Sequence, residues 1–163
     1  MRVARRAAAS FSPKQYEGSL DAEGLRIGVV CARWNPTITD AMLASTLDTL
    51  RRRGARASDV SVARVPGAFE VASGAKALID SGRFHAVIAL AAIVRGETTH
   101  HEVLGHSVAS ALAALTVEAG VPIGFGILTC ETMDQARQRT DKGVEAAEAA
   151  IEMANLRRSL GKA

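Results

Sequence analysis

The nine residues from Ala86 to Val94 constrain the fold of this chain more than any other segment, because all nine are apolar. An apolar run without alternating polar residues is typical of a strand covered on both faces, as in a parallel sheet between layers of helices. The run is too short to cross a bilayer, which takes about 20 apolar residues in a helix. The sequence therefore predicts a buried central strand over residues 86–94 and no membrane partner.

Strand-like and helix-like segments alternate on both sides of this run. Further short apolar runs predict strands over 26–32, 60–65 and 123–128. Apolar residues at helical spacing predict helices over 38–53, 69–79, 100–119 and 132–160, the last with a break at 140–143. This order predicts an α/β fold in which a four-stranded parallel sheet carries helices on both faces. Residues 15–20 are expected to add an N-terminal edge strand.

The length of 163 residues is that of a single domain, which we place at residues 15–163 after a flexible tail over 1–14. The tail lacks the apolar stretch of a secretory signal, so we expect a cytoplasmic protein. The chain has 31 alanines but only six aromatic residues. A core with so few bulky side chains requires helices and strands to approach closely. Contacts between identical subunits are expected to supply part of the apolar burial.

Charge and cysteine patterns exclude several classes of protein. The 20 basic and 17 acidic residues are dispersed, and the arginine-rich run at 51–56 lies where a helix is expected to end. Cations there complement the helix dipole, so we expect no nucleic-acid partner. Cys31 and Cys130 lie in or beside apolar runs without metal-ligand spacing, which predicts reduced core thiols and no metal site.

Ligands of parallel α/β sheets bind beyond the carboxyl ends of the strands. Four segments follow the expected strands there: 33–35, 66–70, 95–100 and 129–132. Trp34 follows the first strand and either packs in the core or stacks on a flat heterocycle. After the second strand, Phe69 and Glu70 either form a turn with Phe69 in the core, or bind a ligand that approaches the backbone at Gly67 and Ala68.

The segment 94–100, Val-Arg-Gly-Glu-Thr-Thr-His, joins the buried strand to the next helix. Its backbone N–H groups and hydroxyls at a helix start suit an anion such as phosphate. An ordinary helix cap by Thr98 or Thr99 explains the same residues. A P-loop is disfavoured because no Gly-Lys-Ser/Thr follows. His100, in the first turn, is either a surface residue or a group that moves protons near neutral pH.

These stretches together resemble the lumazine synthase family. The matching residues are 33–35, 65–70, 93–100, 122–129 and 142–147. The resemblance implies a flavodoxin-like three-layer sandwich, assembled as homopentamers and in some members as larger shells, with each active site between two subunits. It implies that 5-amino-6-(D-ribitylamino)uracil condenses with 3,4-dihydroxy-2-butanone 4-phosphate to give 6,7-dimethyl-8-ribityllumazine, phosphate and water. The attacking amine belongs to the substrate, so the resemblance implies no cofactor.

The resemblance also implies roles for individual residues. Trp34 would stack on the pyrimidine ring, and His100 would act as the general acid and base. The other implied substrate-binding residues are Ala68, Phe69 and Glu70 for the ribityl chain, Ala92, Ile93 and Val94 for the ring, Glu97 and Thr98 for the phosphate, and Phe125 and Arg139 from the adjacent subunit. Asn35 and Lys142 are further candidates. Trp34, Phe69 and Phe125 are expected at the carboxyl ends of strands.

Some residues depart from the family pattern. Only two residues separate Arg139 from Lys142, where the family has a longer linker. His101 stands where an aromatic residue is common, and Cys130 stands where threonine is common. The short linker leaves open a second hypothesis, a catalytically weak paralogue that binds flavin or forms a shell. The archaeal-type riboflavin synthase of the same fold is disfavoured, because this chain retains Arg-Gly-Glu-Thr-Thr-His.

Overall fold

The computed structural model describes residues 11–161, which form a four-stranded parallel sheet between two layers of helices. The strands lie in the order β2-β1-β3-β4. Their bounds are β1 (Ile27–Ala32), β2 (Val60–Val65), β3 (Ala86–Val94) and β4 (Ile123–Cys130). All three neighbouring pairs are parallel. The predicted α/β class and four-stranded sheet are confirmed, and β4 runs two residues beyond its expected end.

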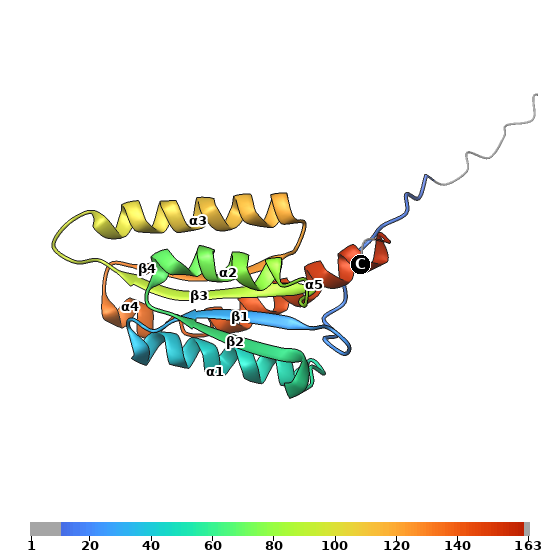
Figure 1. Cartoon of the computed structure of the whole chain (residues 1–163), viewed down its shortest axis with the longest axis horizontal. Coiled ribbons are helices and arrows are strands. Elements are labelled where there is room, and N and C mark those ends of the chain that lie inside the picture. Colours follow the sequence, from blue (N-terminus) through green and yellow to red (C-terminus); the bar gives the residue numbers. More distant parts are fainter. Residues whose placement is uncertain (1–10, 162–163) are drawn as a thin grey trace, which may run out of the picture.

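Helices cover both faces of the sheet (Figure 1). Helices α2 (Val71–Asp80) and α3 (His100–Ala119) pack on one face, and α1 (Pro36–Arg52) and α5 (Lys142–Ser159) pack on the other. The shorter elements are the 3-10 turns η1 (Ala57–Asp59) and η2 (Ala68–Glu70) and the helix α4 (Met133–Arg137). The arrangement is a flavodoxin-like three-layer sandwich. Between residues 11 and 161, no helix is long and apolar enough to span a bilayer.

Strand β3 contributes to both apolar cores, which explains its unbroken apolar sequence. Ile88 and Leu90 are fully buried in the core on the α1 and α5 side. Val87 and Ala89 are fully buried in the core on the α2 and α3 side. Because successive side chains of a strand point to opposite faces, a strand between two helical layers must be apolar at every position.

Small residues let helix α5 lie directly against β4. A Cβ atom on Gly124 would overlap the carbonyl oxygen of Ala146 in α5. On the same face of β4, Gly126 leaves room for the side chain of Leu90 from the neighbouring strand. Close approach of backbones therefore replaces bulky core side chains here, in keeping with the alanine-rich composition.

The expected edge strand over residues 15–20 is wrong, since these residues pair with no strand of the described chain. They run instead beside the end of α5 and then away from the body (Figure 1). The side-chain amide of Asn155 donates hydrogen bonds to the carbonyl oxygens of Ser19, at 2.9 Å, and Asp21, at 2.7 Å. A helix side chain thus takes backbone groups that a strand would have paired. Residues 1–10 of the expected tail lie outside the described residues.

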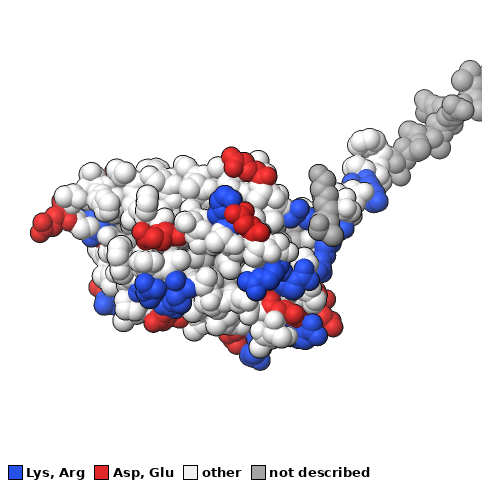
Figure 2. Space-filling model, in the orientation of Figure 1, with Lys and Arg blue, Asp and Glu red and all other residues white. Residues whose placement is uncertain are grey.

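The arginine-rich run closes helix α1, as its position in the sequence predicts. The helix ends at Arg52, and Asp48 pairs with both Arg51 and Arg52 at 2.8 Å. Arg56 pairs with Asp59 in the turn that follows. Basic and acidic residues are interspersed on the face shown in Figure 2. Local ion pairs and the helix dipole therefore account for this run.

At the amino ends of the central strands, His85 accepts a hydrogen bond at Nδ1 from the backbone N–H of Arg26, at 2.9 Å. Burial lowers the pKa of His85, and the nearby charges of Arg26 and Arg158 lower it further. Below about pH 6.5 the unfolded chain takes up a proton on this imidazole while the folded chain stays neutral. We therefore expect His85 to lose its contribution to stability as pH falls from about 6.5 toward its lower folded pKa.

The variant His85→Asn tests this pH dependence, because the Asn carbonyl oxygen accepts the same hydrogen bond and does not titrate. Urea unfolding is measured for both proteins at about pH 7.5 and about pH 5.5. The wild type is expected to lose more free energy of unfolding than the variant between the two pH values. An equal loss in both proteins would contradict the assignment to His85.

Candidate functional site

A cavity of about 300 Å³ opens at the carboxyl ends of β1 and β3, where the sequence predicts a ligand site. It gathers residues from three of the four segments that follow strands. Its lining consists of Trp34, Asn35, Ala68, Ala92, Ile93, Val94, Gly96, Thr98, His100, His101 and Leu104. From β1 the chain passes to β2 on one side and later to β3 on the other side, so the strand order reverses at β1. Ligands of open α/β sheets usually bind at such a point.

Trp34 forms one wall of this cavity and is 65% exposed, so the interpretation as a core residue is wrong. Its backbone N–H donates to the carbonyl oxygen of Pro66 at 3.0 Å. Its ring lies where a Cβ atom of Gly67 would be. The lack of a side chain on Gly67 therefore lets the indole rest on the turn after β2 while leaving ring surface free to stack on a flat ligand.

Asn35 holds the ends of β1 and β3 together. Its side-chain amide donates to the carbonyl oxygen of Ala92 at 2.8 Å. Its backbone has φ 58°, which makes it the one residue other than glycine with positive φ between residues 11 and 161. Asparagine adopts this left-handed conformation more readily than most residues. The structure thus shows Asn35 as a link between two strands at the floor of the cavity.

The loop from β3 to α3 brings Thr98 and His100 to the cavity. The Thr98 hydroxyl accepts a hydrogen bond from the backbone N–H of His100 at 3.3 Å. Thr99 is the N-cap residue of α3, but its side chain makes no capping bond. Capping by Thr99 is therefore wrong, whereas Thr98 does contact the first turn. His100 is exposed to solvent and lines the same space.

The turn after β2 places only one of its candidate residues in the cavity wall. Ala68 lines the cavity, whereas Phe69 and Glu70 do not. A carboxylate oxygen of Glu70 accepts a hydrogen bond from the backbone N–H of Gly67 at 3.0 Å, so the turn interpretation of Glu70 is confirmed. Phe69 is 68% exposed, which makes its interpretation as a core residue wrong.

Four other candidates lie apart from the cavity: Glu97, Phe125, Arg139 and Lys142. Phe125 is the third residue of β4 and pairs with Ala89, so its expected position at a carboxyl end is wrong. Ala92 lies three positions after Ala89, a distance of about 10 Å along a strand. Phe125 is still 43% exposed and, on the edge strand, lines a separate hollow with Leu112 and Thr116 of α3.

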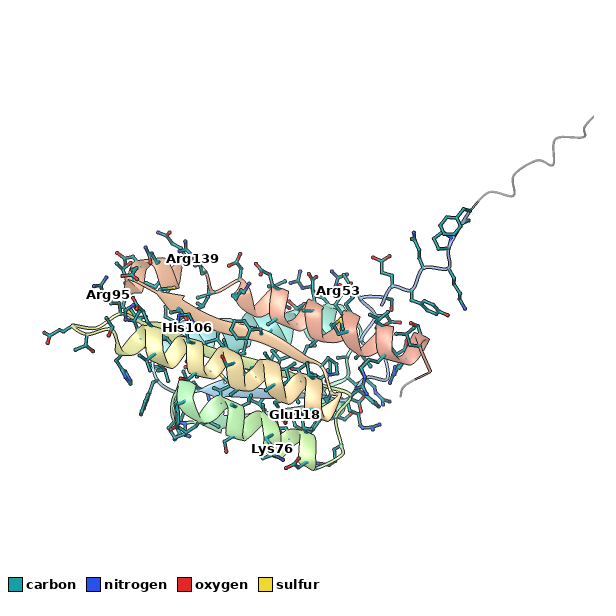
Figure 3. The ribbon with its side chains drawn as sticks, turned by 90° about the horizontal axis from the view of Figure 1, so that it is seen from above. Arg53, Lys76, Arg95, His106, Glu118 and Arg139 are labelled. Atoms are coloured by element: carbon teal, nitrogen blue, oxygen red, sulfur yellow. The ribbon has the colours of Figure 1, made fainter. Side chains whose placement is uncertain are left out.

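Arg139 and Lys142 lie on either side of Thr140 and Asp141, where the chain passes from α4 to α5. The Arg139 guanidinium donates to the carbonyl oxygen of Gln135 at 2.9 Å, and Lys142 pairs with Glu145. Figure 3 shows Arg139 and Arg95 at the same end of the molecule, near the start of α3. Burial raises the pKa of the Cys130 thiol and the charge of Arg139 opposes this effect, so Arg139 lies near the carboxyl end of β4.

Residues 24–158 match the family model described as 6,7-dimethyl-8-ribityllumazine synthase. The chain belongs to this family. The matched range contains every strand and every residue that lines the cavity. Membership in the lumazine synthase family connects the chain to riboflavin biosynthesis.

In this member of the lumazine synthase family, Glu131, directly after β4, contacts residues on both sides of the loop before α3. The sequence did not reveal these contacts. Arg95 donates to one carboxylate oxygen of Glu131 at 2.8 Å, and this hydrogen bond is the main cause that lowers the pKa of Glu131. His101, only 4% exposed, faces the other carboxylate oxygen at 3.6 Å. Glu131 belongs to the fourth segment after a strand, but sequence spacing does not show which residues it contacts.

The two cysteines, Cys31 and Cys130, are free and buried, as their apolar surroundings in the sequence predict. Burial raises the pKa of the Cys31 thiol, as it does for Cys130. The thiol of Cys31 lies 3.7 Å from the carbonyl oxygen of Thr39 in α1. Buried thiols with raised pKa values are poor nucleophiles, so they serve as small core residues.

Proposed function

We propose that this chain condenses 5-amino-6-(D-ribitylamino)uracil with 3,4-dihydroxy-2-butanone 4-phosphate to form 6,7-dimethyl-8-ribityllumazine. The observation that carries the proposal is the single cavity shared by Trp34, Thr98 and His100. It combines an exposed aromatic ring, hydroxyl and backbone groups at a helix start, and an imidazole. These are the groups needed to hold a flat heterocycle beside a phosphorylated ketone and to move protons between them.

The pyrimidine is proposed to lie between the Trp34 ring and the end of β3. Burial of two aromatic faces stabilises such a stack. Backbone groups of Ala92, Ile93 and Val94 line the same space and can bind the polar edge of the ring. The ribityl chain would extend toward Ala68, Phe69 and Glu70, which follow β2 at the adjoining strand end.

The phosphate is proposed to bind in the loop before α3, at Glu97 and Thr98. Hydroxyl and N–H groups at the amino end of a helix stabilise an anion, and the helix dipole adds to this attraction. His100 lies one turn of backbone away in the same cavity. It is proposed to move protons during imine formation, phosphate elimination and ring closure. Holding the two reactants in register can lower such a barrier by roughly 7–11 kcal/mol.

The remaining candidates are proposed to act from a neighbouring copy of the chain. Phe125 and Arg139 lie outside the cavity of their own subunit, and Phe125 keeps an exposed face on the edge strand. A homopentamer with sites between subunits would bring these residues to the cavity of the next copy. A mass measurement in solution tests the assembly and separates a pentamer from a decamer or a larger shell.

Incubation of the purified chain with both substrates tests the proposed reaction. Fluorescent lumazine is expected to form faster than in the same mixture without protein, and one phosphate is expected per lumazine. Product formation at the uncatalysed rate would contradict the proposal. Tight riboflavin binding without turnover would instead favour the scaffold hypothesis.

Arg139→Ala is expected to raise the KM for the phosphorylated substrate by about tenfold, with little change in the KM for the pyrimidine. An arginine that donates two hydrogen bonds to a phosphate contributes roughly 1.5–3 kcal/mol to binding. Steady-state kinetics with each substrate varied in turn measure the two constants. The matched control is Arg137→Ala, two residues earlier at the end of α4 and paired with Asp134. Equal increases in both KM values would contradict the assigned role of Arg139.

A further inference from the structure

Two residues at opposite ends of the loop before α3 converge on the same carboxylate. Arg95 begins the loop and donates to Oε2 of Glu131 at 2.8 Å. His101 lies in the first turn of α3, directly after the loop, and its Nε2 faces Oε1 of Glu131 at 3.6 Å. Glu131 follows β4 on a different part of the chain, and its own N–H donates to the side chain of Gln135 at 2.9 Å. The five residues between Arg95 and His101 are thus spanned by contacts to one side chain.

His101 also contacts the middle of the loop. Its Nδ1 lies 3.3 Å from the carbonyl oxygen of Thr98, and because a carbonyl oxygen only accepts, Nδ1 carries the hydrogen. Its Nε2 is buried and has no hydrogen-bond partner among residues 11–161. A buried polar atom without a partner is energetically unfavourable. The nearest acidic oxygens are those of Glu131, at 3.6 Å, and Glu102, at 4.0 Å.

We propose that Glu131 is a positioning residue that holds the loop carrying Thr98 and His100 in place through Arg95 and His101. The ion pair with Arg95 keeps the start of the loop beside the end of β4, where the backbone N–H of Arg95 also donates to the carbonyl oxygen of Cys130 at 2.9 Å. When the imidazole carries hydrogens on both nitrogens, a small movement of the Glu131 side chain would bring Oε1 within hydrogen-bond distance of Nε2 of His101. Arg95 uses its guanidinium for Glu131 and its backbone N–H for Cys130, so Arg95 is a structural residue of the loop.

This inference rests on the proposed function for its effect on rate, but its effect on loop order is independent of that function. Thr98 and His100 lie in an exposed segment, and the two contacts of Thr98, to the N–H of His100 and to Nδ1 of His101, are both local. Contacts to Glu131 therefore supply much of what fixes the loop relative to the sheet. A misplacement of about 1 Å in a reacting group can lower the rate about 100-fold.

Glu131→Ala tests the proposal, with Asp134→Ala as the matched control. Asp134 is an exposed acid three residues away that pairs with Arg137 and does not contact the loop. Hydrogen exchange of the hydrogen-bonded backbone amides of Arg95, Glu102 and Val103, which flank the loop, is expected to become about tenfold faster in Glu131→Ala and to stay unchanged in Asp134→Ala. Glu131→Gln retains an oxygen that accepts from Arg95, so it is expected to restore most of the protection.

Kinetics give a second readout. A residue that only stabilises the fold would not change kcat and one KM while leaving the other KM unchanged. Glu131→Ala is expected to lower kcat by about 10- to 100-fold and to raise the KM of the phosphorylated substrate, while the KM of the pyrimidine stays within about twofold. His101→Phe fills the same buried space without either nitrogen and is expected to change exchange and kcat in the same direction. It also serves as the test if Glu131→Ala does not fold.

The outcomes separate this proposal from the proposed function. Unchanged exchange at Arg95, Glu102 and Val103 in both Glu131→Ala and His101→Phe would overturn the positioning role. Faster exchange with unchanged kcat would show that Glu131 orders the loop without positioning its reacting groups, which also overturns the proposal. If the wild type forms no lumazine, the proposed function fails, and weaker binding of inorganic phosphate by Glu131→Ala than by Asp134→Ala still supports the role of Glu131.

Discussion

Replacement of His100 with alanine is expected to lower kcat by about 100-fold, because a positioned acid and base contributes 10²–10⁴-fold in typical enzymes. The side chain lines the cavity but is exposed, so it contributes little to packing. The free energy of unfolding is expected to stay within about 0.5 kcal/mol of the wild-type value. Lumazine formation at saturating substrate measures kcat, and urea unfolding measures stability.

His106→Ala is the matched control for this prediction, since His106 is an exposed histidine on the same helix but outside the cavity (Figure 3). It is expected to retain wild-type kcat. Residual activity of His100→Ala is also expected, because the cavity still holds the two substrates in register. An unchanged kcat in His100→Ala would refute the assigned role, and a similar loss in both variants would show that the effect is not specific to the site.

Replacement of Leu90 with alanine is expected to lower the free energy of unfolding by about 2–5 kcal/mol, the usual range for this substitution in a core. Leu90 is fully buried in the middle of β3 and fills the space above Gly126 in β4. The neighbouring residues Gly126 and Ala146 are too small to fill the cavity that the substitution creates. A loss of this size is a large part of the 5–15 kcal/mol that stabilises a typical domain.

Leu47→Ala is the control for this stability prediction, because Leu47 is 37% exposed on helix α1. Leu47→Ala is expected to lower the free energy of unfolding by about 1 kcal/mol or less. The partly exposed Leu47 side chain buries less apolar area on folding than a core leucine does, and alanine favours the helix. Both variants are compared with the wild type by urea unfolding at the same protein concentration, because assembly shifts apparent stability. A loss below about 1 kcal/mol in Leu90→Ala would contradict the tight packing of this core.

Much of the fold could be predicted from the sequence because the strongest local patterns agree with the tertiary structure. The apolar run at 86–94 becomes the central strand with its predicted bounds. The helix predicted over 100–119 is also found with its predicted bounds. An unbroken apolar run marks the strand buried on both faces, and apolar residues at helical spacing mark α3, so local sequence carries the information in both cases.

The errors arose where a contact distant in sequence decided the outcome. Residues 15–20 pair with no described strand, and Asn155 of α5 binds the carbonyl oxygens of Ser19 and of Asp21, just beyond them. Phe125 looked like a residue at the end of a strand, but pairing with β3 extends β4 to Cys130. Glu131 lay in a segment correctly expected near the ligand edge, yet its contacts with Arg95 and His101 come from residues more than 25 positions away.

The sequence by itself determined the α/β class, the central buried strand and the edge of the sheet where Trp34, Thr98 and His100 meet. These follow from local periodicity and from the rule that parallel strands end at a common edge. Only the tertiary structure decided that Trp34 lies over Gly67, that Asn35 ties β1 to β3, and that Glu131 joins both ends of the loop before α3. Those contacts depend on distances between side chains of separate elements, and no local pattern encodes such distances.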